Sequence, residues 1–327
     1  MKKYKICKIL LVILAIFLCV AFYELLGICV AYKKQPEVSN TTKKETKNGS
    51  WNECSENTER AVIIEKNPEA LLQRVRLIKN AKKEIILSTF AFQSDESGKL
   101  ILGALHDAAD RGVHIRLLVD GMESWIDMEG NPYFYGLSSH ENVEIKLYNK
   151  ANPLKPWKMM GRMHDKYLIA DGKRYILGGR NTYNYFLGDF PGHKNYDRDV
   201  LVVCDEPEKE NSVNQLLEYF ETIWEQEDSG YFHDNKKLAN RKSVKNAVLE
   251  LQNGYQKYFE ENKERICDID YTDETFETEK IALVSNPIHT GSKEPVVWYQ
   301  LGELMKNAKN RVKIHTPYII CNDMIDR

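Results

Sequence analysis

The chain has 327 residues, of which 43% are hydrophobic and 29% are charged. This is ordinary usage for a globular protein, so we expect one large or two medium domains with substantial cores. The formal net charge of −2 excludes a chain that is polybasic as a whole.

The N-terminus is first basic and then apolar. Four lysines in the first eight residues precede an apolar run over residues 9–32, which is interrupted by Glu24. A helix of this length crosses about 30 Å of hydrocarbon, so we predict an uncleaved membrane anchor over residues 1–32 and a cell-membrane location. A cleaved signal peptide is the alternative, although its best cleavage site, residues 29–31, is poor. Similar lysine counts on both flanks leave the orientation open.

The rest of the chain shows a polar stretch followed by alternating elements. Residues 33–60 are poor in aliphatic side chains, which predicts a flexible linker. Amphipathic helices then alternate with β-branched strands, which indicates an α/β fold with helices flanking a sheet. The predicted helices cover residues 67–82, 99–111, 208–226 and 240–264, and the predicted strands cover residues 83–92, 113–120, 143–148, 163–170, 175–177 and 199–203.

A basic region occupies the middle of the chain. Residues 150–198 contain ten Lys or Arg against four Asp, a local charge of +6. Such a field favours an anionic substrate, and both lipid head groups and nucleic acid qualify. Within it, residues 152–162 (NPLKPWKMMGR) combine Trp157, Met159 and Met160 with lysines. A loop of this kind suits a membrane interface, and packing beneath the sheet is the alternative.

The segment 163–186 reads MHDKYLIADGKRYILGGRNTYNYF and has the pattern of a β-hairpin. The turn signal is Asp-Gly at residues 171–172, between two strands rich in Tyr and Ile. Because side chains alternate along a strand, His164 and Lys166 are expected on one face and Asp165 on the other.

The end of this hairpin adds an amide to the same place. The glycine pair at 178–179 allows backbone to approach whatever lies over His164, and Asn181 follows directly. A nucleophilic imidazole, the Lys166 ammonium and an amide suit attack on a phosphate and require no metal. The seven cysteines lack Cys-x-x-Cys spacing, so neither a zinc site nor a disulfide framework is indicated.

The whole string resembles the HKD signature of the phospholipase D superfamily. Every position of that signature is filled, by His164, Lys166, Asp171, the glycine pair and Asn181. The resemblance implies a phosphohistidine intermediate, in which one His attacks phosphorus and a His from a second copy of the motif protonates the leaving group. Water or an alcohol then completes the transfer. It also implies a phospholipase D-like sandwich, a mixed sheet flanked by helices.

Individual roles follow from the same resemblance. His164 would be the nucleophile or the acid/base partner. Lys166 and Asn181 would bind phosphate oxygens, with Arg180 as a further substrate-binding residue, and Asp171 would be mainly structural.

The resemblance also implies an acidic residue further along that orients the histidine. The segment NYDRDVLVV offers Asp197, with Asp199 as the less favoured choice. Both carboxylates face the same way along a strand, so the sequence does not separate them.

A subtype resemblance narrows the expected function. The string GGRNTYNYF followed by DRDV is similar to the cardiolipin synthase branch. This implies a membrane-anchored phosphatidyltransferase or phosphodiesterase that uses an anionic, phosphatidylglycerol-like phospholipid, with no cofactor, metal or specific nucleic-acid partner. Two alternatives stay open: a membrane-tethered phospholipase D-like nuclease or phosphodiesterase, and a catalytically dead fragment that binds anionic lipid.

An internal repeat is predicted near the end of the sequence. The segment 79–92 (KNAKKEIILSTFAF) shares five of fourteen residues with 306–319 (KNAKNRVKIHTPYI). We therefore expect a first lobe over residues 61–240 that carries the motif. Residues 241–327 would hold connecting helices and the start of a truncated second lobe. Such a chain would carry half a site, be weakly active or inactive alone, and gain a complete site only by pairing as a homodimer.

Overall fold

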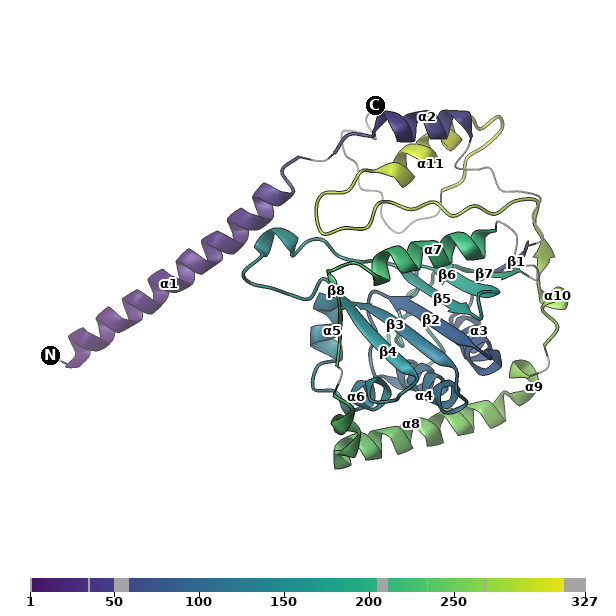
Figure 1. Cartoon of the computed structure of the whole chain (residues 1–327), viewed down its shortest axis with the longest axis horizontal. Helices are drawn as coiled ribbons and strands as arrows, with labels where there is room; N and C mark the ends of the chain where they lie inside the picture. The colour runs from purple at the N-terminus through teal and green to yellow at the C-terminus, as the bar shows by residue number, and fades with distance from the viewer. Residues whose placement is uncertain are drawn as a thin grey trace.

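The structure, a computed structural model, describes residues 2–34, 36–49, 59–204, 211–233, 235–267 and 269–314. This part of the chain is built around one mixed sheet (Figure 1). Its strands are β1 (Glu59–Ile64), β2 (Glu84–Thr89), β3 (His114–Asp120), β4 (Val143–Tyr148), β5 (Lys166–Ala170), β6 (Arg174–Gly178), β7 (Asp199–Cys204), β8 (Ser229–Tyr231) and β9 (Phe276–Glu277). Their order across the sheet is β8-β4-β3-β2-β5-β6-β7-β1-β9. Strands β2, β3 and β4 are parallel, and the other neighbouring pairs are antiparallel.

Helices cover both faces of this sheet, and one further helix projects from the domain (Figure 1). The α-helices are α1 (Lys2–Ala31), α2 (Asn40–Asn48), α3 (Asn67–Asn80), α4 (Glu96–Asp110), α5 (Gly121–Asp127), α6 (Pro132–Ser138), α7 (Ser212–Trp224), α8 (Lys242–Glu261), α9 (Lys263–Ile266), α10 (Tyr271–Glu274) and α11 (Val296–Lys306). The described residues also contain two 3₁₀ turns, η2 (Pro156–Lys158) and η3 (Lys236–Asn240). The most apolar part of α1, Tyr4–Ala31, is long and apolar enough to cross a membrane, by length and composition alone.

The central strands send alternate side chains into two cores. Ile85 and Leu87 of β2 join the larger core, under α3, α4, α6 and α8. Ile86, between them, joins the smaller core under α7. Because both faces of the sheet are apolar, both must be covered by helices, which explains the layered arrangement. The predicted α/β fold with a mixed sheet and flanking helices is confirmed.

Most predicted elements appear close to their predicted bounds. The helices expected over 67–82 and 99–111 are α3 and α4, and the strands expected over 113–120 and 143–148 are β3 and β4. The motif strand is shorter than predicted, because β5 begins at Lys166 instead of 163.

The polar stretch predicted as a flexible linker contains structure. Ser39 caps α2 by accepting the Thr42 backbone N–H, and Gly49 ends the helix with a φ of 74°. The Thr42 hydroxyl donates to Glu294 at 2.7 Å, which holds α2 to the C-terminal part of the chain. The linker prediction is therefore corrected for residues 40–48, and its residues 50–58 lie outside the described ones.

The repeat predicted at 306–319 can be followed only in its first half. α11 ends at Lys306, the counterpart of Lys79 at the end of α3, so both copies of the Lys-Asn-Ala-Lys run close a helix. Residues 311–314 are not in a strand, and residues 315–327 lie outside the described ones. The strand half of the repeat stays a prediction.

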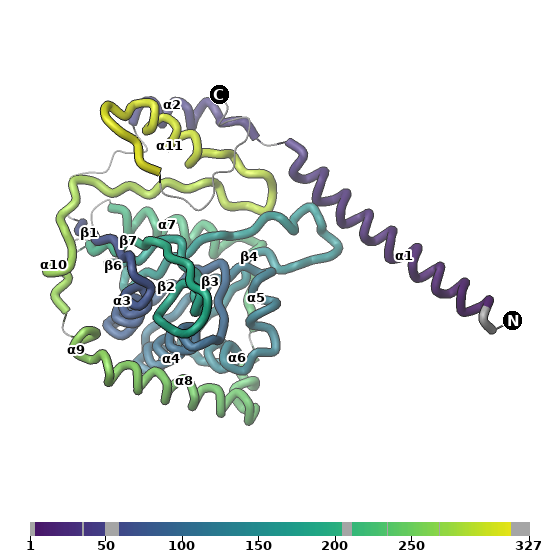
Figure 2. Tube along the Cα trace, turned by 180° about the vertical axis from the view of Figure 1, so that it is seen from behind, coloured from purple at the N-terminus to yellow at the C-terminus, as the bar shows by residue number. Residues whose placement is uncertain are grey.

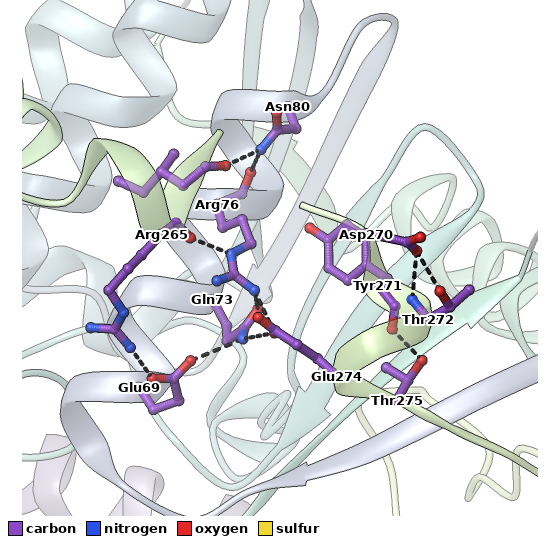
Figure 3. Close-up of polar contacts among 11 residues, drawn as sticks. Glu69, Gln73, Arg76, Asn80, Arg265, Asp270, Tyr271, Thr272, Glu274 and Thr275 are labelled. Carbon is purple, nitrogen blue, oxygen red and sulfur yellow. Dashed lines mark hydrogen bonds and ion pairs between the residues drawn. The ribbon is translucent and has the colours of Figure 1, made fainter. Parts of the chain in front are cut away.

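A polar network fastens the chain that follows α8 to α3 (Figure 3). The Arg76 guanidinium is its centre, because it donates to the Arg265 carbonyl oxygen at 2.7 Å and pairs with Glu274 at 2.6 Å. Gln73 donates to the same Glu274 carboxylate, and the Asn80 amide donates to the carbonyl oxygen of Ile266. This attachment directs the chain to β9 at the sheet edge.

We expect Arg76→Ala to lower the free energy of unfolding by about 2 kcal/mol. The substitution removes the buried cation that pairs with the Glu274 carboxylate and donates to the Arg265 carbonyl oxygen. Arg265→Ala is the matched control. Its guanidinium is more than half exposed and pairs with Glu69, so it should cost less than about 0.5 kcal/mol. Urea unfolding of both variants measures the difference, and equal losses would contradict the assigned role of Arg76.

After β9 the chain crosses the α7 face of the sheet in an extended path (Figures 1 and 2). The Leu283 N–H donates to Gln215 of α7 at 2.8 Å, and the Gln226 amide donates to the Ile288 carbonyl oxygen at 2.8 Å. The segment 283–297 thereby forms one wall of a cleft on this face.

Candidate active site

The motif segment folds as the predicted β-hairpin. β5 and β6 pair antiparallel, and the turn places Asp171 and Gly172 in the left-handed region, with φ values of 55° and 62°. The Asp171 carboxylate accepts the backbone N–H groups of Lys82, Lys83 and Glu84 at 2.7 to 3.1 Å. These bonds tie the hairpin to the start of β2. They suit the structural role expected of Asp171, which stays a prediction.

A cleft of about 370 Å³ opens on the α7 face where β5 begins. Its lining includes His164, Asp165 and Lys166 from the motif, Tyr219 from α7, and residues of the segment 283–297. His164 is exposed, whereas Lys166 is almost fully buried. The histidine and the lysine of the motif therefore meet at one cleft, as the sequence predicts.

The expected orientation of Asp165 is wrong. Residues 161–165 precede β5, so strand alternation does not apply to them, and Asp165 lines the same cleft. The Tyr219 hydroxyl donates to its Oδ2 at 2.7 Å. Burial raises the pKa of Asp165, and burial together with the adjacent carboxylate raises the pKa of Tyr219. Tyr219 therefore serves as a neutral donor that holds the Asp165 carboxylate in place.

Lys166 is a buried ammonium at the base of the cleft. Its Nζ donates to the carbonyl oxygen of His164 at 2.7 Å and lies 5.2 Å from the centre of the Phe90 ring. Burial lowers the pKa of Lys166 to about 8, although the carboxylates of Asp165 and Asp197 act in the opposite direction. An incoming anion would stabilise the charged form of this ammonium, because it would replace the water that the ammonium lost on burial.

The His164 ring contacts Phe90, the aromatic ring that also lies near Lys166. The two rings pack edge-on, with centroids 4.7 Å apart. The ring is exposed but partly desolvated by the cleft walls, which lowers the pKa of His164 below its ordinary value of 6.5, and the charge of Lys166 lowers it further. The imidazole is consequently neutral at pH 7, which is the form in which a ring nitrogen can act as a nucleophile.

Asn181 lies behind the cleft. Its side chain is buried, and its Oδ1 accepts the Ala91 N–H at 3.2 Å. The neighbouring Thr182 N–H donates to the Ala91 carbonyl oxygen at 3.1 Å. Asn181 thus anchors the chain after β2 that carries Phe90, the ring in contact with both His164 and Lys166. Its predicted contact with phosphate oxygens stays a prediction.

The predicted role of Arg180 in substrate binding is corrected. Its side chain is fully buried and donates to the backbone carbonyl oxygens of Ile64, Glu65 and Asp197. It also pairs with Asp199 at 3.3 Å. A guanidinium whose donors are committed to the interior is a structural crosslink between the motif and β1, and it is not available to a substrate.

The two candidate aspartates differ in their surroundings. Asp199 is fully buried and pairs with Arg74 at 2.9 Å as well as with Arg180. Asp197 is only half-buried, and its charge reaches Lys166. The structure therefore makes Asp199 an internal partner of arginines. Among the described residues no hydrogen bond joins Asp197 to His164, so its orienting role stays a prediction.

The glycine pair makes room for two carboxylates. A Cβ on Gly178 would lie 1.9 Å from the Asp199 carboxylate, and one on Gly179 would lie 1.9 Å from the Asp197 carboxylate. Asp199 begins β7 and Asp197 lies just before it. Gly178 also lines the cleft that holds His164, where the sequence predicts a glycine.

Several residues in or next to the cleft were not identified from the sequence. The Asp120 carboxylate accepts the Met163 N–H at 3.0 Å and pairs with Arg162 at 3.3 Å, which fixes the chain entering the motif. Lys293 lines the opposite wall and donates to the Arg162 carbonyl oxygen at 3.2 Å. The position of Asp120 at the carboxyl end of a predicted strand was a usable signal. Lys293 and Tyr219 carry none, because they are distant in sequence.

The chemistry of the cleft follows from these groups. It presents a neutral imidazole beside two ammonium groups, Lys166 and Lys293, and one carboxylate held by a phenol. Among the residues that the structure describes, no three His, Cys, Asp or Glu side chains gather as metal ligands would. This set can bind an anionic phosphate and bring an uncharged nitrogen to it.

Comparison with known proteins identifies the domain. Residues 74–224 match the family model described as "Cardiolipin synthase, PLD-like domain". Residues 74–224 form a phospholipase D-like domain. The predicted membership of the phospholipase D superfamily, with a likeness to cardiolipin synthases, is thereby confirmed.

Curated relatives match longer stretches of the chain. An uncharacterized protein of Helicobacter pylori strain J99 is 28% identical over 292 residues, which cover 80% of this chain and 54% of the relative. Cardiolipin synthase C of Escherichia coli K12 is 29% identical over 171 residues, which cover 48% of this chain and 34% of that enzyme. The chain thus spans about half the length, or less, of the curated relatives it matches.

Solved structures with a similar chain path include two bacterial proteins. NucT from Helicobacter pylori gives a TM-score of 0.42 at 18% identity and covers 53% of this chain and 99% of its own. A phosphatidylserine synthase of Haemophilus influenzae gives 0.43 at 16% identity and covers 75% of this chain and 52% of its own. Neither likeness bears on activity.

Proposed function

We propose that the chain acts in phosphodiester transfer on a phospholipid, with His164 as the nucleophile at phosphorus. The observation that carries the proposal is the shared cleft of His164 and Lys166, in which a neutral imidazole stands beside a buried ammonium. The likeness of the domain to cardiolipin synthases supports the same chemistry.

The proposed reaction has two steps. A ring nitrogen of His164 forms a bond to phosphorus as the bond to the leaving alkoxide breaks, and the alkoxide takes a proton from a general acid. An alcohol or water then attacks the phosphohistidine and gives its proton to the conjugate base of that general acid, and the P–N bond breaks so that His164 leaves as a neutral imidazole. Lys166 stabilises the charge that builds on the non-bridging oxygens. The family resemblance implies that the general acid is a histidine from a second copy of the motif.

The proposed substrate is an anionic phospholipid of the phosphatidylglycerol kind, and the proposed location is the membrane. The basic region around the motif favours an anion, and α1 is long and apolar enough to serve as an anchor. The same cleft chemistry would cleave the phosphodiesters of nucleic acid, so a membrane-tethered nuclease is the second candidate.

A direct assay separates these candidates. The full chain, purified in a mild detergent, is incubated with phosphatidylglycerol vesicles and with single- and double-stranded DNA, each with and without EDTA. Slow conversion of the lipid to a product carrying the phosphatidyl group, unaffected by EDTA and faster at higher protein concentration, is expected. Cleavage of DNA alone would overturn the lipid assignment. Loss of all activity in EDTA, restored by one divalent metal, would overturn the proposed mechanism.

The pH dependence of kcat/KM is expected to be bell-shaped. His164 must be unprotonated to attack, so the rate falls as the pH drops below its pKa, which lies under 6.5. Lys166 must be protonated to stabilise the transition state, so the rate falls as the pH rises past about 8. A water-soluble phosphodiester is the substrate of choice for this profile, because it has no ionisation of its own in this range.

Lys166→Arg tests the assignment of the alkaline limb. A guanidinium stays charged across the range, so this variant should be slower at pH 7 yet lose the fall near pH 8, while the acid limb is kept. An alkaline limb that is unchanged in Lys166→Arg would show that another group causes it.

A further inference from the structure

Five large apolar side chains lie exposed on one side of the domain. Trp125 and Ile126 belong to α5, and Leu154, Trp157 and Met160 belong to the loop around η2. Their exposed fractions run from 45% to 78%, which is unusual for so many large apolar groups on one side of a soluble surface. We call these five residues the apolar patch.

The two parts of the patch adjoin one another. Trp125 shares a hollow of about 390 Å³ with Ala151 and Pro153 of the loop. Both α5 and the loop lie on the side of the domain from which α1 departs, as two opposite views show (Figures 1 and 2). The patch is therefore one surface next to the candidate membrane helix.

The loop makes direct contact with α1. Pro156 packs against Gly27 so closely that a Cβ on the glycine would lie 2.5 Å from its ring. The Tyr23 hydroxyl donates to the Leu154 carbonyl oxygen at 3.0 Å. Tyr23 lies eight residues before the end of α1 at Ala31, so at 1.5 Å per residue the loop reaches roughly 12 Å back along the helix.

That depth corresponds to the zone between head groups and acyl chains when α1 spans a bilayer. The composition of the loop fits the same zone, because residues 150–162 contain four cations and no acidic residue. Tryptophan and lysine are the residues that settle at this boundary, the first by its amphipathic ring and the second by its long stem.

The patch also leads to the active-site cleft. Met160 shares a hollow with Tyr32, at the end of α1, and with Lys293. Lys293 in turn lines the cleft that holds His164. A lipid head group under the patch would thus lie next to the entrance of the cleft, beside the Lys293 ammonium.

We propose that the apolar patch inserts into the surface of an anionic bilayer, as a second membrane contact that holds the cleft open to lipid head groups. This proposal rests on the proposed anchor and lipid substrate. It adds to them a specific surface that acts during catalysis, and its partner is the lipid surface itself.

Tryptophan quenching tests the insertion. The full chain is reconstituted into vesicles of phosphatidylglycerol and phosphatidylcholine whose acyl chains are brominated near the head group. A double variant, Trp125→Phe/Trp157→Phe, should lose most of the quenchable fluorescence. Trp224→Phe is the matched control, since Trp224 is buried in the core under α7, and it should keep that fluorescence.

Activity provides the second arm. Leu154→Ser/Trp157→Ser should lower turnover of phosphatidylglycerol in vesicles by at least about tenfold, because two inserted apolar side chains are lost. Turnover of a water-soluble phosphodiester should stay within about twofold, because neither residue lines the cleft. Leu249→Ser removes an exposed leucine on α8 that is outside the patch; it is the control and should change neither rate.

The outcomes are distinguishable from failure of the proposed function. Retention of the chain on vesicles after an alkaline wash reports the anchor, and turnover of the soluble phosphodiester reports the chemistry. An anchored, active chain whose Trp125 and Trp157 are not quenched would overturn the patch alone. A blue shift of their emission that rises with protein concentration in detergent, without lipid, would assign the patch to contact between copies and would also overturn the proposal.

Discussion

Replacing His164 with alanine is expected to reduce turnover of any phosphodiester substrate by at least about 10⁴-fold, because covalent catalysis has no substitute nucleophile in the cleft. The residue is exposed and its ring packs edge-on against Phe90, so the fold should be kept. Initial rates with a chromogenic soluble diester and with phosphatidylglycerol vesicles measure the loss.

Two controls make this result specific to His164. His193→Ala removes another exposed histidine, on the segment that precedes β7, and should leave the rate within about twofold. Thermal unfolding of both variants should match the parent chain. A second readout is a phosphate label that stays on the parent chain in alkali and is released by acid, as a phosphoramidate bond requires. Near-normal turnover in His164→Ala, or a label that persists in it, would refute the nucleophile assignment.

Lys166→Ala should cost about 10² to 10³ in kcat, the range seen when one preorganised donor to a developing oxyanion is removed. The Lys166 ammonium is almost fully buried beside the nucleophile, and its lowered pKa shows that it is held at an energetic cost. Because the charge acts mainly on the transition state, kcat should fall more than KM rises.

Lys173→Ala is the matched control for this substitution. Lys173 is an exposed lysine in the same hairpin, close to the Asp171 turn, and its removal tests whether general positive charge explains the effect. A loss in Lys173→Ala comparable with that in Lys166→Ala would indicate simple electrostatic steering, which high salt would also suppress.

Asp171, Arg180 and Asp199 support the active site by holding the motif hairpin in place. Asp171 ties the hairpin to β2, and Arg180 with Asp199 ties it to β1 and α3. These attachments are hydrogen bonds to backbone groups and buried ion pairs, so they hold the start of β5 in one position. A cleft built from an exposed histidine and a buried lysine needs such support, because small displacements of the reacting groups are costly.

The sequence by itself determined the α/β class, the main helices and strands, the hairpin and the pairing of His164 with Lys166. These features depend on local periodicity and on the Asp-Gly turn, which act over a few residues and do not require the rest of the fold. The superfamily was equally accessible, because its signature lies within 18 residues, from 164 to 181.

Only the tertiary structure decided which polar groups meet at the cleft and which are buried. Asp165 lines the cleft because β5 begins at Lys166, later than the sequence pattern predicts. The Arg180 side chain is buried because it donates to three backbone carbonyl oxygens, those of Ile64, Glu65 and Asp197. Lys293 and Tyr219 reach the cleft from segments far from the motif in sequence. Side-chain direction and burial depend on packing between such segments. Local sequence patterns do not show which distant segments will lie side by side in the fold.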